Sequence, residues 1–134
     1  GEAKAVIRRF RKEIEAVLKL DGEARFKRFI KVVVDCEQAW GLWEDGWALL
    51  EDDSGVRVFP LWPGRKYAEL CRSRDWGNHE AKPIALDDLL NSLLPKLREQ
   101  FVLAGVFPTP SGRGVTPSLD ILETELQKEL ERYD

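Results

Sequence analysis

Residues 40–60 read WGLWEDGWALLEDDSGVRVFP and contain two chain reversals between apolar runs. The first reversal is Asp45-Gly46, which lies between two aromatic segments. This dipeptide is typical of a tight β-hairpin, because both turn residues must adopt a positive φ. If the turn has two residues, Trp43 faces Ala48 across the hairpin.

The second reversal is Asp53-Ser54-Gly55. We expect a three-residue loop with the glycine in the left-handed region, which sets Glu51 beside Arg57 and Leu50 beside Val58. Together the two reversals predict a three-stranded antiparallel meander. Its middle strand is apolar on both faces, so helices are expected to cover both sides of the sheet, at least in part.

Apolar side chains with helical spacing flank the meander on both sides. They predict a helix over Ala3–Lys19 and a second helix, which Asp21 caps and which ends near Gln38. The elements predicted after the meander are a helix over 64–72, a strand over 82–86 with Pro83 at a sheet edge or at the strand start, a helix that Asp87 caps and Pro95 kinks or divides, a strand over Phe101–Phe107, a short strand at Val115-Thr116 and a helix over Pro117–Tyr133.

The order of these elements predicts one α+β domain over residues 1–134. Residues 1–20 form an appended helix, and residues 21–134 form the core. The sheet is expected to be mixed and mostly antiparallel, with helices on its flanks. Its predicted strands are the meander from Trp40 to Trp62 and the strands near 82–86 and 101–107.

The tripeptide Val-Phe-Pro occurs twice, at 58–60 and at 106–108. The simplest explanation is that a proline ends each of two strands. If the two strands run parallel, the loops that follow them meet at one end of the sheet, which is where open sheets tend to bind ligands.

Of the 134 residues, 43% are hydrophobic and 34% are charged, a balance that excludes a disordered chain. The net charge of -3 provides no overall positive field for nucleic acid. A local basic face runs from Arg8 to Lys12, but Glu13 and Glu15 can pair with it along the helix. A solvated helix face is therefore the first interpretation, and a weak nucleic-acid patch is the alternative.

Cys36 and Cys71 are the only cysteines, a number that suits a reducing compartment, so we expect a cytoplasmic protein. Whether the two thiols lie close together is left open. With His79, the single histidine, they offer too few ligands at the wrong spacing for structural zinc, and no metal or cofactor is predicted. No apolar run approaches the length needed to cross a bilayer.

Tryptophans, prolines and glycines occur along the chain in the order Trp40-Gly41-Leu42-Trp43, Asp45-Gly46-Trp47-Ala48-Leu49, Val58-Phe59-Pro60-Leu61-Trp62-Pro63, Tyr67-Ala68 and Val106-Phe107-Pro108-Thr109-Pro110 with Gly112 and Gly114. From about Asp21 to the C-terminus, this pattern resembles domain-of-unknown-function family 2750, a family of small bacterial proteins. The resemblance implies a compact cytoplasmic domain of helices and antiparallel strands, and it implies no reaction, cofactor or partner. A fainter similarity connects the chain to secretion-associated and toxin-immunity domains that act by binding proteins.

His79 is the candidate for catalysis, because an imidazole can act as a general base near neutral pH. Nucleophilic catalysis would pair it with Cys71 or Ser73 and with an orienting carboxylate such as Asp75. The sequence around these residues matches no nucleophile elbow and no cysteine-protease motif. A histidine that braces a surface loop is therefore the first interpretation, and a small enzyme centred on His79 is the alternative.

Five tryptophans in 134 residues are far above ordinary usage, and core packing explains at least half of them. Indole rings that stay at the surface are typical anchors for a protein partner. We expect Trp62 and Trp76 to be exposed, because both lie next to loops, and we expect Arg65, Tyr67 and Arg113 to complete the patch. The sequence therefore predicts a non-enzymatic protein-binding module, of immunity or regulatory type, and leaves its oligomeric state open.

Overall fold

The computed structural model describes residues 11–75, 77–110, 112 and 114–133. Residues 11–18 are helical, and the first part of the helix predicted over Ala3–Lys19 lies outside the described residues. The elements that follow are α2 (Gly22–Cys36), β1 (Gln38–Trp43), β2 (Leu50–Glu51), β3 (Arg57–Leu61), α3 (Arg65–Asp75), β4 (Glu80–Ala85), α4 (Leu86–Asp88), the π-helical turn η1 (Leu89–Leu93), α5 (Leu94–Glu99), β5 (Leu103–Val106) and α6 (Leu119–Glu131). The predicted α+β class is confirmed.

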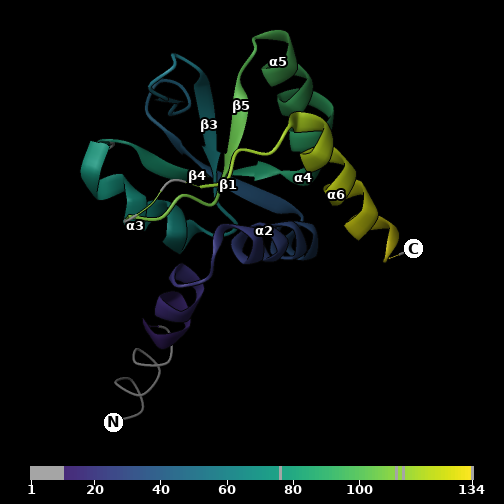
Figure 1. Ribbon diagram of the computed structural model, residues 1–134, viewed down its shortest axis with the longest axis horizontal. Coiled ribbons are helices and arrows are strands. Elements are labelled where there is room, and N and C mark those ends of the chain that lie inside the picture. The colour runs from purple at the N-terminus through teal and green to yellow at the C-terminus, as the bar shows by residue number, and fades with distance from the viewer. Residues whose placement is uncertain (1–10, 76, 111, 113, 134) are drawn as a thin grey trace.

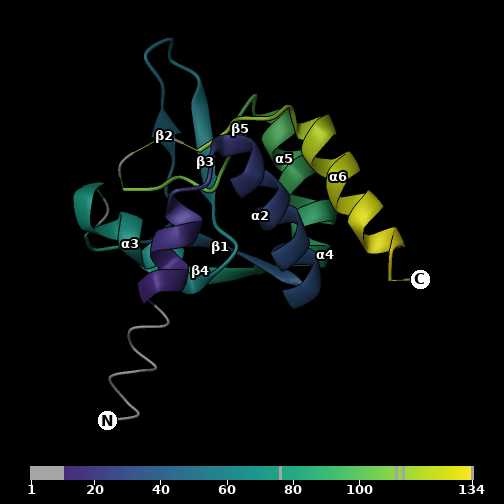
Figure 2. The same cartoon turned by 60° about the horizontal axis from the view of Figure 1, so that its bottom comes forward.

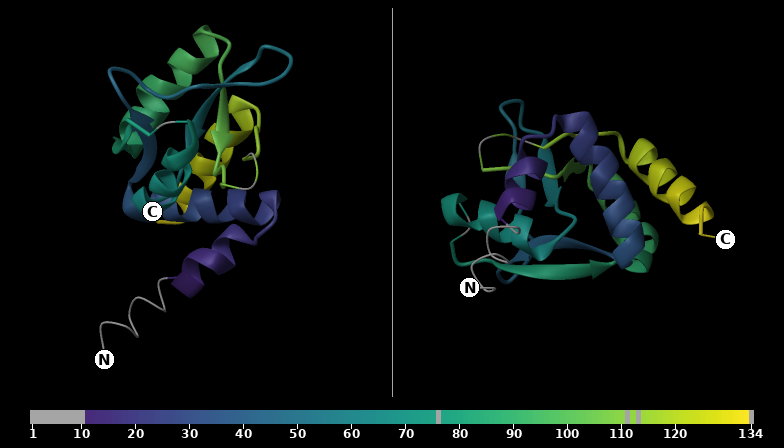
Figure 3. Two further views of the ribbon diagram at one scale, coloured as in Figure 1. Left: turned by 90° about the vertical axis from the view of Figure 1, so that its left-hand side faces the viewer. Right: turned by 90° about the horizontal axis from the view of Figure 1, so that it is seen from below.

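Two small sheets form the centre of the molecule, one of β1 and β4 and the other of β2, β3 and β5. Figures 1 and 2 show α3 at one end of these sheets and α5 with α6 at the other, while α2 packs beneath them. The ribbon of β1 and β4 crosses the direction of β3 and β5 (Figure 3). No helix in the described part of the chain has the length and apolar character that a membrane crossing requires.

Helix α2 begins as the sequence predicts. The Asp21 side chain caps it by accepting a hydrogen bond from the Ala24 N–H at 2.8 Å. The helix ends at Cys36, two residues before the predicted end, because Glu37 adopts a left-handed conformation with φ of 57°. This early end allows β1 to start at Gln38.

The reversal at Asp45-Gly46 is confirmed, and both residues have a positive φ (52° and 155°). The register differs from the prediction: Trp43 pairs with Trp47, and the Ala48 N–H donates to the Leu42 carbonyl at 2.8 Å. The loop therefore has one residue more than a two-residue turn, and Ala48 does not face Trp43.

The second predicted reversal is confirmed, since Leu50 pairs with Val58 and Glu51 with Arg57, and Gly55 has φ of 87°. The continuous middle strand of the meander is wrong, because only Leu50–Glu51 remains as β2. Strand β1 pairs along its length with β4, and only an isolated bridge from Trp43 to Trp47 joins it to the segment after the first turn.

The two Val-Phe-Pro strands are parallel neighbours, with Val58 opposite Leu103 and Leu61 opposite Val106. On its other edge, β3 pairs with β2 at Val58, and Trp62, just beyond the strand, exchanges two backbone hydrogen bonds of 2.9 Å with Trp40. Alternate residues of a strand face the same edge, so the nitrogen of Pro60 lies between these two pairings. Proline has no N–H to donate, so Pro60 makes no hydrogen bond on this edge of β3. The edge therefore pairs with β2 before Pro60 and with Trp40 of β1 after it, and the strands belong to two sheets.

Pro83 lies in β4, opposite Trp40, and β4 is an edge strand, which is one of the two predicted alternatives. The Trp40 backbone groups point away from β4, toward Trp62. The pair of Trp40 and Pro83 is therefore not hydrogen-bonded, and the Pro83 nitrogen faces the outer edge. The fold tolerates the proline for this reason.

The predicted cap at Asp87 is wrong: the helix starts at Leu86, whose N–H donates to the Glu37 carbonyl at 2.9 Å. Pro95 was predicted to kink or divide the helix, and the helix is divided near it into α4, η1 and α5. The turn just before Pro95 is π-helical, and the Leu94 N–H bonds to the Leu89 carbonyl, one residue further back than in an α-helix.

Candidate functional site

Two of the five residues predicted to form the binding patch are buried. Trp62 is 0% exposed and Tyr67 is 4% exposed, so the prediction that these two rings are available to a partner is wrong. Trp76 and Arg113 lie outside the described residues. Arg65 is exposed, pairs with Glu69 at 3.1 Å and lies 5.9 Å from the centre of the half-buried Trp40 ring.

The parallel arrangement of β3 and β5 explains why Trp62 is buried. The loops after these strands do meet, and the Trp62 Nε1–H donates to the Pro108 carbonyl at 2.9 Å. The Cys71 thiol donates to the same carbonyl at 3.4 Å, and the Tyr67 and Phe107 rings pack with centres 4.9 Å apart. The chain's own side chains therefore occupy the sheet end that could have held a ligand.

Burial raises the pKa of the Tyr67 hydroxyl above its usual 10.0, and the nearby Arg28 guanidinium offsets part of this effect. Arg28 also pairs with Glu13 at 3.5 Å, which ties residues 11–18 to α2. Glu13 is thus engaged with α2, while Arg11 and Lys12 remain exposed. The rest of the predicted basic face, Arg8 to Phe10, lies outside the described residues.

A different aromatic cluster remains partly exposed. The rings of Trp43 and Trp47 meet edge to face, with centres 5.0 Å apart and planes at 82°. The Lys82 ammonium lies 4.2 Å from the centre of the Trp43 ring and 5.8 Å from that of Trp47. We call Trp43, Trp47 and Lys82 the tryptophan surface; both rings are half-buried and the lysine is exposed.

The Trp47 ring of this surface packs against Gly41. A Cβ at Gly41 would lie 2.9 Å and 3.0 Å from the Cζ3 and Cε3 atoms of Trp47. The indole therefore packs directly on the backbone of β1, and it also contacts Phe59 with ring centres 5.6 Å apart. Contact with Phe59, which is buried in the core, fixes the orientation of the indole.

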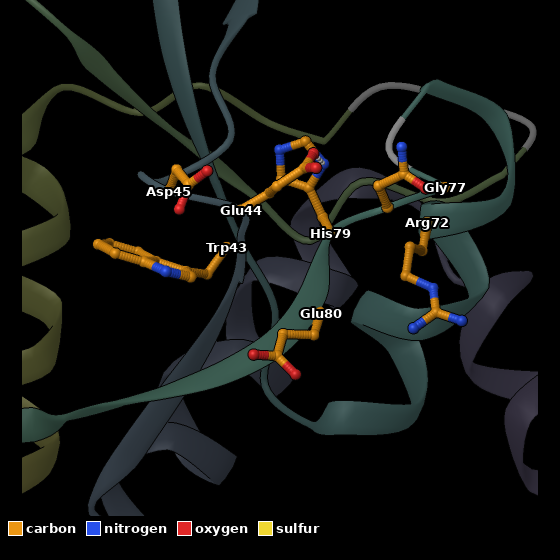
Figure 4. Close-up of a pocket in the computed structure, with 8 residues that line it drawn as sticks. Trp43, Glu44, Asp45, Arg72, Gly77, His79 and Glu80 are labelled. Atoms are coloured by element: carbon orange, nitrogen blue, oxygen red, sulfur yellow. Dashed lines mark ion pairs between the residues drawn. The ribbon is translucent and has the colours of Figure 1, made fainter.

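A polar pocket of ~360 Å³ adjoins the tryptophan surface at Trp43, and it is open to solvent. Its lining comes from the turn after β1, from α3 and from the start of β4. The lining residues are Trp43, Glu44, Asp45, Arg72, Gly77, Asn78, His79 and Glu80. Figure 4 shows Trp43 and Asp45 on one side of the pocket and Arg72 with Gly77 on the other.

His79 packs against Glu44 in this pocket. The distance from His79 Nδ1 to Glu44 Oε2 is 3.6 Å, which is an ion-pair separation and is longer than a hydrogen bond. The His79 side chain is 19% exposed and the Glu44 side chain 45%. The pair connects the turn after β1 to the segment before β4, which agrees with a loop-bracing histidine.

The catalytic alternative gains no nucleophile from the described residues. Cys71 is buried and does not line the polar pocket. The side chains of Ser73 and Asp75 lie outside the described residues. Among the side chains that the structure does describe, no group of three or more histidine, cysteine or carboxylate residues could hold a metal ion.

Sequence reasoning missed the polar pocket and the tryptophan surface, because both join residues from distant elements. Trp43 and Lys82 share one face of the β1–β4 sheet, and only the pairing of these strands brings them together. The available signal was the alternation along β1, which places Trp43 on the same face as Gly41.

The model of a family described as protein of unknown function (DUF2750) matches residues 26–126 of the chain. No curated protein matches the chain.

Proposed function

The chain belongs to the DUF2750 family, and from that premise we propose that it is a non-enzymatic protein-binding module whose partner docks on the tryptophan surface. The observation that carries the proposal is the pair of half-buried indoles at Trp43 and Trp47, in edge-to-face contact at 5.0 Å. The proposed setting is the bacterial cytoplasm, and the proposed role is regulation or immunity. No disulfide joins Cys36 and Cys71, which agrees with a reducing compartment.

Large, rigid aromatic rings favour a docking role on energetic grounds. A tryptophan buries a large apolar area while losing few rotamers, and it is therefore enriched among the residues that dominate binding energies. Trp47 is held by Gly41 and Phe59 before any partner arrives, so little further ordering is needed on binding. Lys82 adds a cation at the rim of the two rings.

The test compares Trp43→Ala with Phe101→Ala in capture of a partner from bacterial lysate, followed by affinity measurement with the purified partner. Phe101 is an exposed aromatic residue, 89% accessible, on a turn outside the tryptophan surface, and it is the matched control. We expect Trp43→Ala to weaken binding by at least ~30-fold, a loss of about 2 kcal/mol. We expect the Phe101 variant to change the affinity less than ~2-fold.

A partner that binds both variants as tightly as wild type would overturn the proposal. A partner whose binding is lost with Phe101→Ala but retained with Trp43→Ala would also overturn the proposal. Circular dichroism of both variants checks that a lost interaction does not come from unfolding. Trp43 is preferred to Trp47 for the test, because Trp47 also supports the core through Phe59.

A small enzyme centred on His79 is the second candidate, and the position of Glu44 beside His79 Nδ1 favours it. A carboxylate in this place can orient an imidazole so that its other nitrogen acts as a base. His79→Ala separates the candidates: it should abolish cellular function if the protein is such an enzyme and leave partner binding intact. The weaker nucleic-acid alternative, through Arg8 to Lys12, stays a prediction, to be tested by the salt dependence of binding.

A further inference from the structure

Residues 11–20 lie against α2 and beside α3, and we call them the N-terminal segment (Figures 2 and 3). The surface beneath them includes Arg25 and Arg28 of α2 and Tyr67 of α3, and we call it the docking face. We infer that the docking face is a second binding site, separate from the tryptophan surface, for an amphipathic helix of a partner protein. The N-terminal segment occupies this site until such a helix replaces it.

The segment contacts the core through one narrow apolar stripe. Val17 is 5% exposed and belongs to the core, while Ile14 and Leu18 are half-buried against it. The helical residues 11–13, 15 and 16 are exposed. An apolar stripe with this spacing on an otherwise solvated helix is the pattern by which separate helices bind apolar grooves. A partner helix that presents three apolar side chains at the same spacing can therefore make the same contacts.

Two arginines of α2 bind the two ends of the segment. The Arg28 guanidinium lies 3.5 Å from the Glu13 carboxylate, and the Arg25 guanidinium donates a hydrogen bond to the Leu20 carbonyl. The side chains of Arg28 and Glu13 are 38% and 51% exposed, so their pair fixes the orientation of the helix more than it strengthens binding. A partner helix needs a carboxylate just before its first apolar residue to make this pair. The carbonyl at its C-terminal end requires no particular side chain.

Two polar atoms of the docking face are enclosed without a hydrogen-bond partner among the described residues. They are the Tyr67 hydroxyl and the Arg25 Nε. The charges of Arg28 and Glu13 both act on the Tyr67 hydroxyl, and its raised pKa means that it keeps its proton and remains a donor. A buried donor without an acceptor destabilises the arrangement that encloses it. A partner helix that places an amide or carboxylate oxygen here therefore gains a hydrogen bond that the chain's own segment does not make.

The chain is fixed immediately after the segment. The Asp21 side chain caps α2 by accepting from the Ala24 N–H at 2.8 Å. The backbone of Gly22 packs so closely on Val115 that a Cβ at Gly22 would lie 2.6 Å from Val115 Cγ1. These contacts hold the start of α2 without help from residues 11–20. The N-terminal segment can therefore leave while α2 stays in place.

The extent of the family match separates the docking face from the segment that covers it. The match begins at residue 26 and ends at residue 126. Arg28 and Tyr67 lie within it, and the N-terminal segment lies outside it. The docking face thus belongs mainly to the domain that the family shares, whereas its cover does not.

The experiment opens the docking face in the whole chain and supplies the helix again as a separate molecule. Val17→Asp places a charge at a buried position of the segment and should release it. The probe is a synthetic peptide of residues 11–20, RKEIEAVLKL, titrated into isotope-labelled protein and followed by NMR. We expect saturable shifts at Arg28 and Tyr67 in the Val17→Asp protein, with a dissociation constant on the order of 0.1–1 mM. The wild type, whose docking face is covered, should bind the peptide at least ~10-fold more weakly.

Matched controls separate the apolar stripe from the rest of the segment. Ala16→Asp adds the same charge on the exposed side of the helix, so this protein should behave as the wild type does. A peptide that carries Val17→Asp should bind neither protein. A third peptide keeps Glu13 and the stripe but has glutamine at the exposed positions 11, 12, 15, 16 and 19, and it should bind within ~3-fold of the first. Arg28→Gln in the Val17→Asp protein should weaken the first peptide ~2–5-fold.

Two peptide results would refute the inference. The first is a folded Val17→Asp protein that does not bind the peptide of residues 11–20, or that binds the peptide with Val17→Asp equally well. The second is binding of the natural peptide without binding of the glutamine peptide, because a helix from another protein would then not be recognised. Trp43→Ala should leave peptide binding unchanged, since the tryptophan surface is a separate site.

Hydrogen exchange of the wild-type protein decides the matter if Val17→Asp does not fold. We expect the amides of residues 15–18, which are helical, to exchange together and at least ~30-fold faster than the amide of Val33 in α2. Exchange at the same rate as Val33 would mean that the segment opens only when the whole chain unfolds. That result would refute a segment that a partner helix can replace.

Discussion

Replacing Gly41 by alanine adds one methyl group beneath the Trp47 indole and so tests how this ring packs on β1. The backbone at Gly41 is outside the left-handed region, so alanine fits the strand conformation itself. The new Cβ would meet Trp47 at 2.9 Å and 3.0 Å and Ile84 Cδ1 at 3.5 Å. Distances below 3.0 Å are not tolerated between carbon atoms, so the Trp47 indole or the backbone beneath it must shift.

The magnitude follows from two opposing effects. Overpacking of a well-filled site costs about 1–3 kcal/mol. Replacing a glycine within a strand returns about 0.5–1 kcal/mol, because the unfolded chain loses conformational freedom. The net expectation is a destabilisation of about 1.3 kcal/mol within a range of about 0–2.5 kcal/mol, and the central value corresponds to a fall in Tm of roughly 4–6 °C for a domain of this size.

Urea unfolding followed by far-UV circular dichroism measures the free energy, and near-UV circular dichroism reports the contact between Trp43 and Trp47. Gly77→Ala is the matched control, since nothing lies within 4 Å of its added Cβ. In a Trp47→Leu background, where the clashing ring is gone, Gly41→Ala should cost much less than it does in the wild type, which a double-mutant cycle measures. A Gly41→Ala protein as stable as wild type, with an unchanged near-UV spectrum, would refute the packing of Trp47 on Gly41.

Three further outcomes are expected. Trp62→Phe should lower the free energy of unfolding in urea by about 2–4 kcal/mol, because it removes the hydrogen bond to Pro108 and leaves a void; a loss below ~1 kcal/mol would contradict this. The raised pKa of Tyr67 means that the folded state holds its proton more tightly than the unfolded chain, so stability present below pH 10.0 should decline above it, and Tyr67→Phe should reduce that decline in denaturation curves. Pro83→Val restores an N–H on the outer edge of β4; sedimentation velocity should show increased self-association with stability changed by less than ~1 kcal/mol, and an unchanged monomer would argue against this role of the proline.

Local chemistry explains the parts of the fold that could be predicted. Asp21 caps α2, and the second reversal has the predicted pairs of Leu50 with Val58 and Glu51 with Arg57. Each of these features depends on residues only a few positions apart, where turn chemistry and capping decide the conformation. The cap at Asp87 was wrong because a distant carbonyl, that of Glu37, receives the Leu86 N–H and starts the helix earlier.

The sequence predicted the type of candidate site, an aromatic surface, but not the residues that form it. A high content of tryptophan predicted an aromatic surface, but among the described tryptophans it is Trp40, Trp43 and Trp47 that are half-buried, while Trp62 is buried. Proximity to a loop did not expose Trp62, because the loop after β5 folds back and supplies the Pro108 carbonyl for its N–H. A pairing across 46 positions in the chain leaves no local signal.

The amino-acid sequence by itself determined the existence of the helices and the two reversals, since these follow from the conformational preferences of adjacent residues. Only the tertiary structure decided that β1 pairs with β4, that β3 and β5 run parallel, and which indoles remain accessible. The physical reason is that burial depends on which distant surfaces meet, and each strand can satisfy its backbone hydrogen bonds with more than one neighbour. The energy of packing the whole core selects among these alternatives.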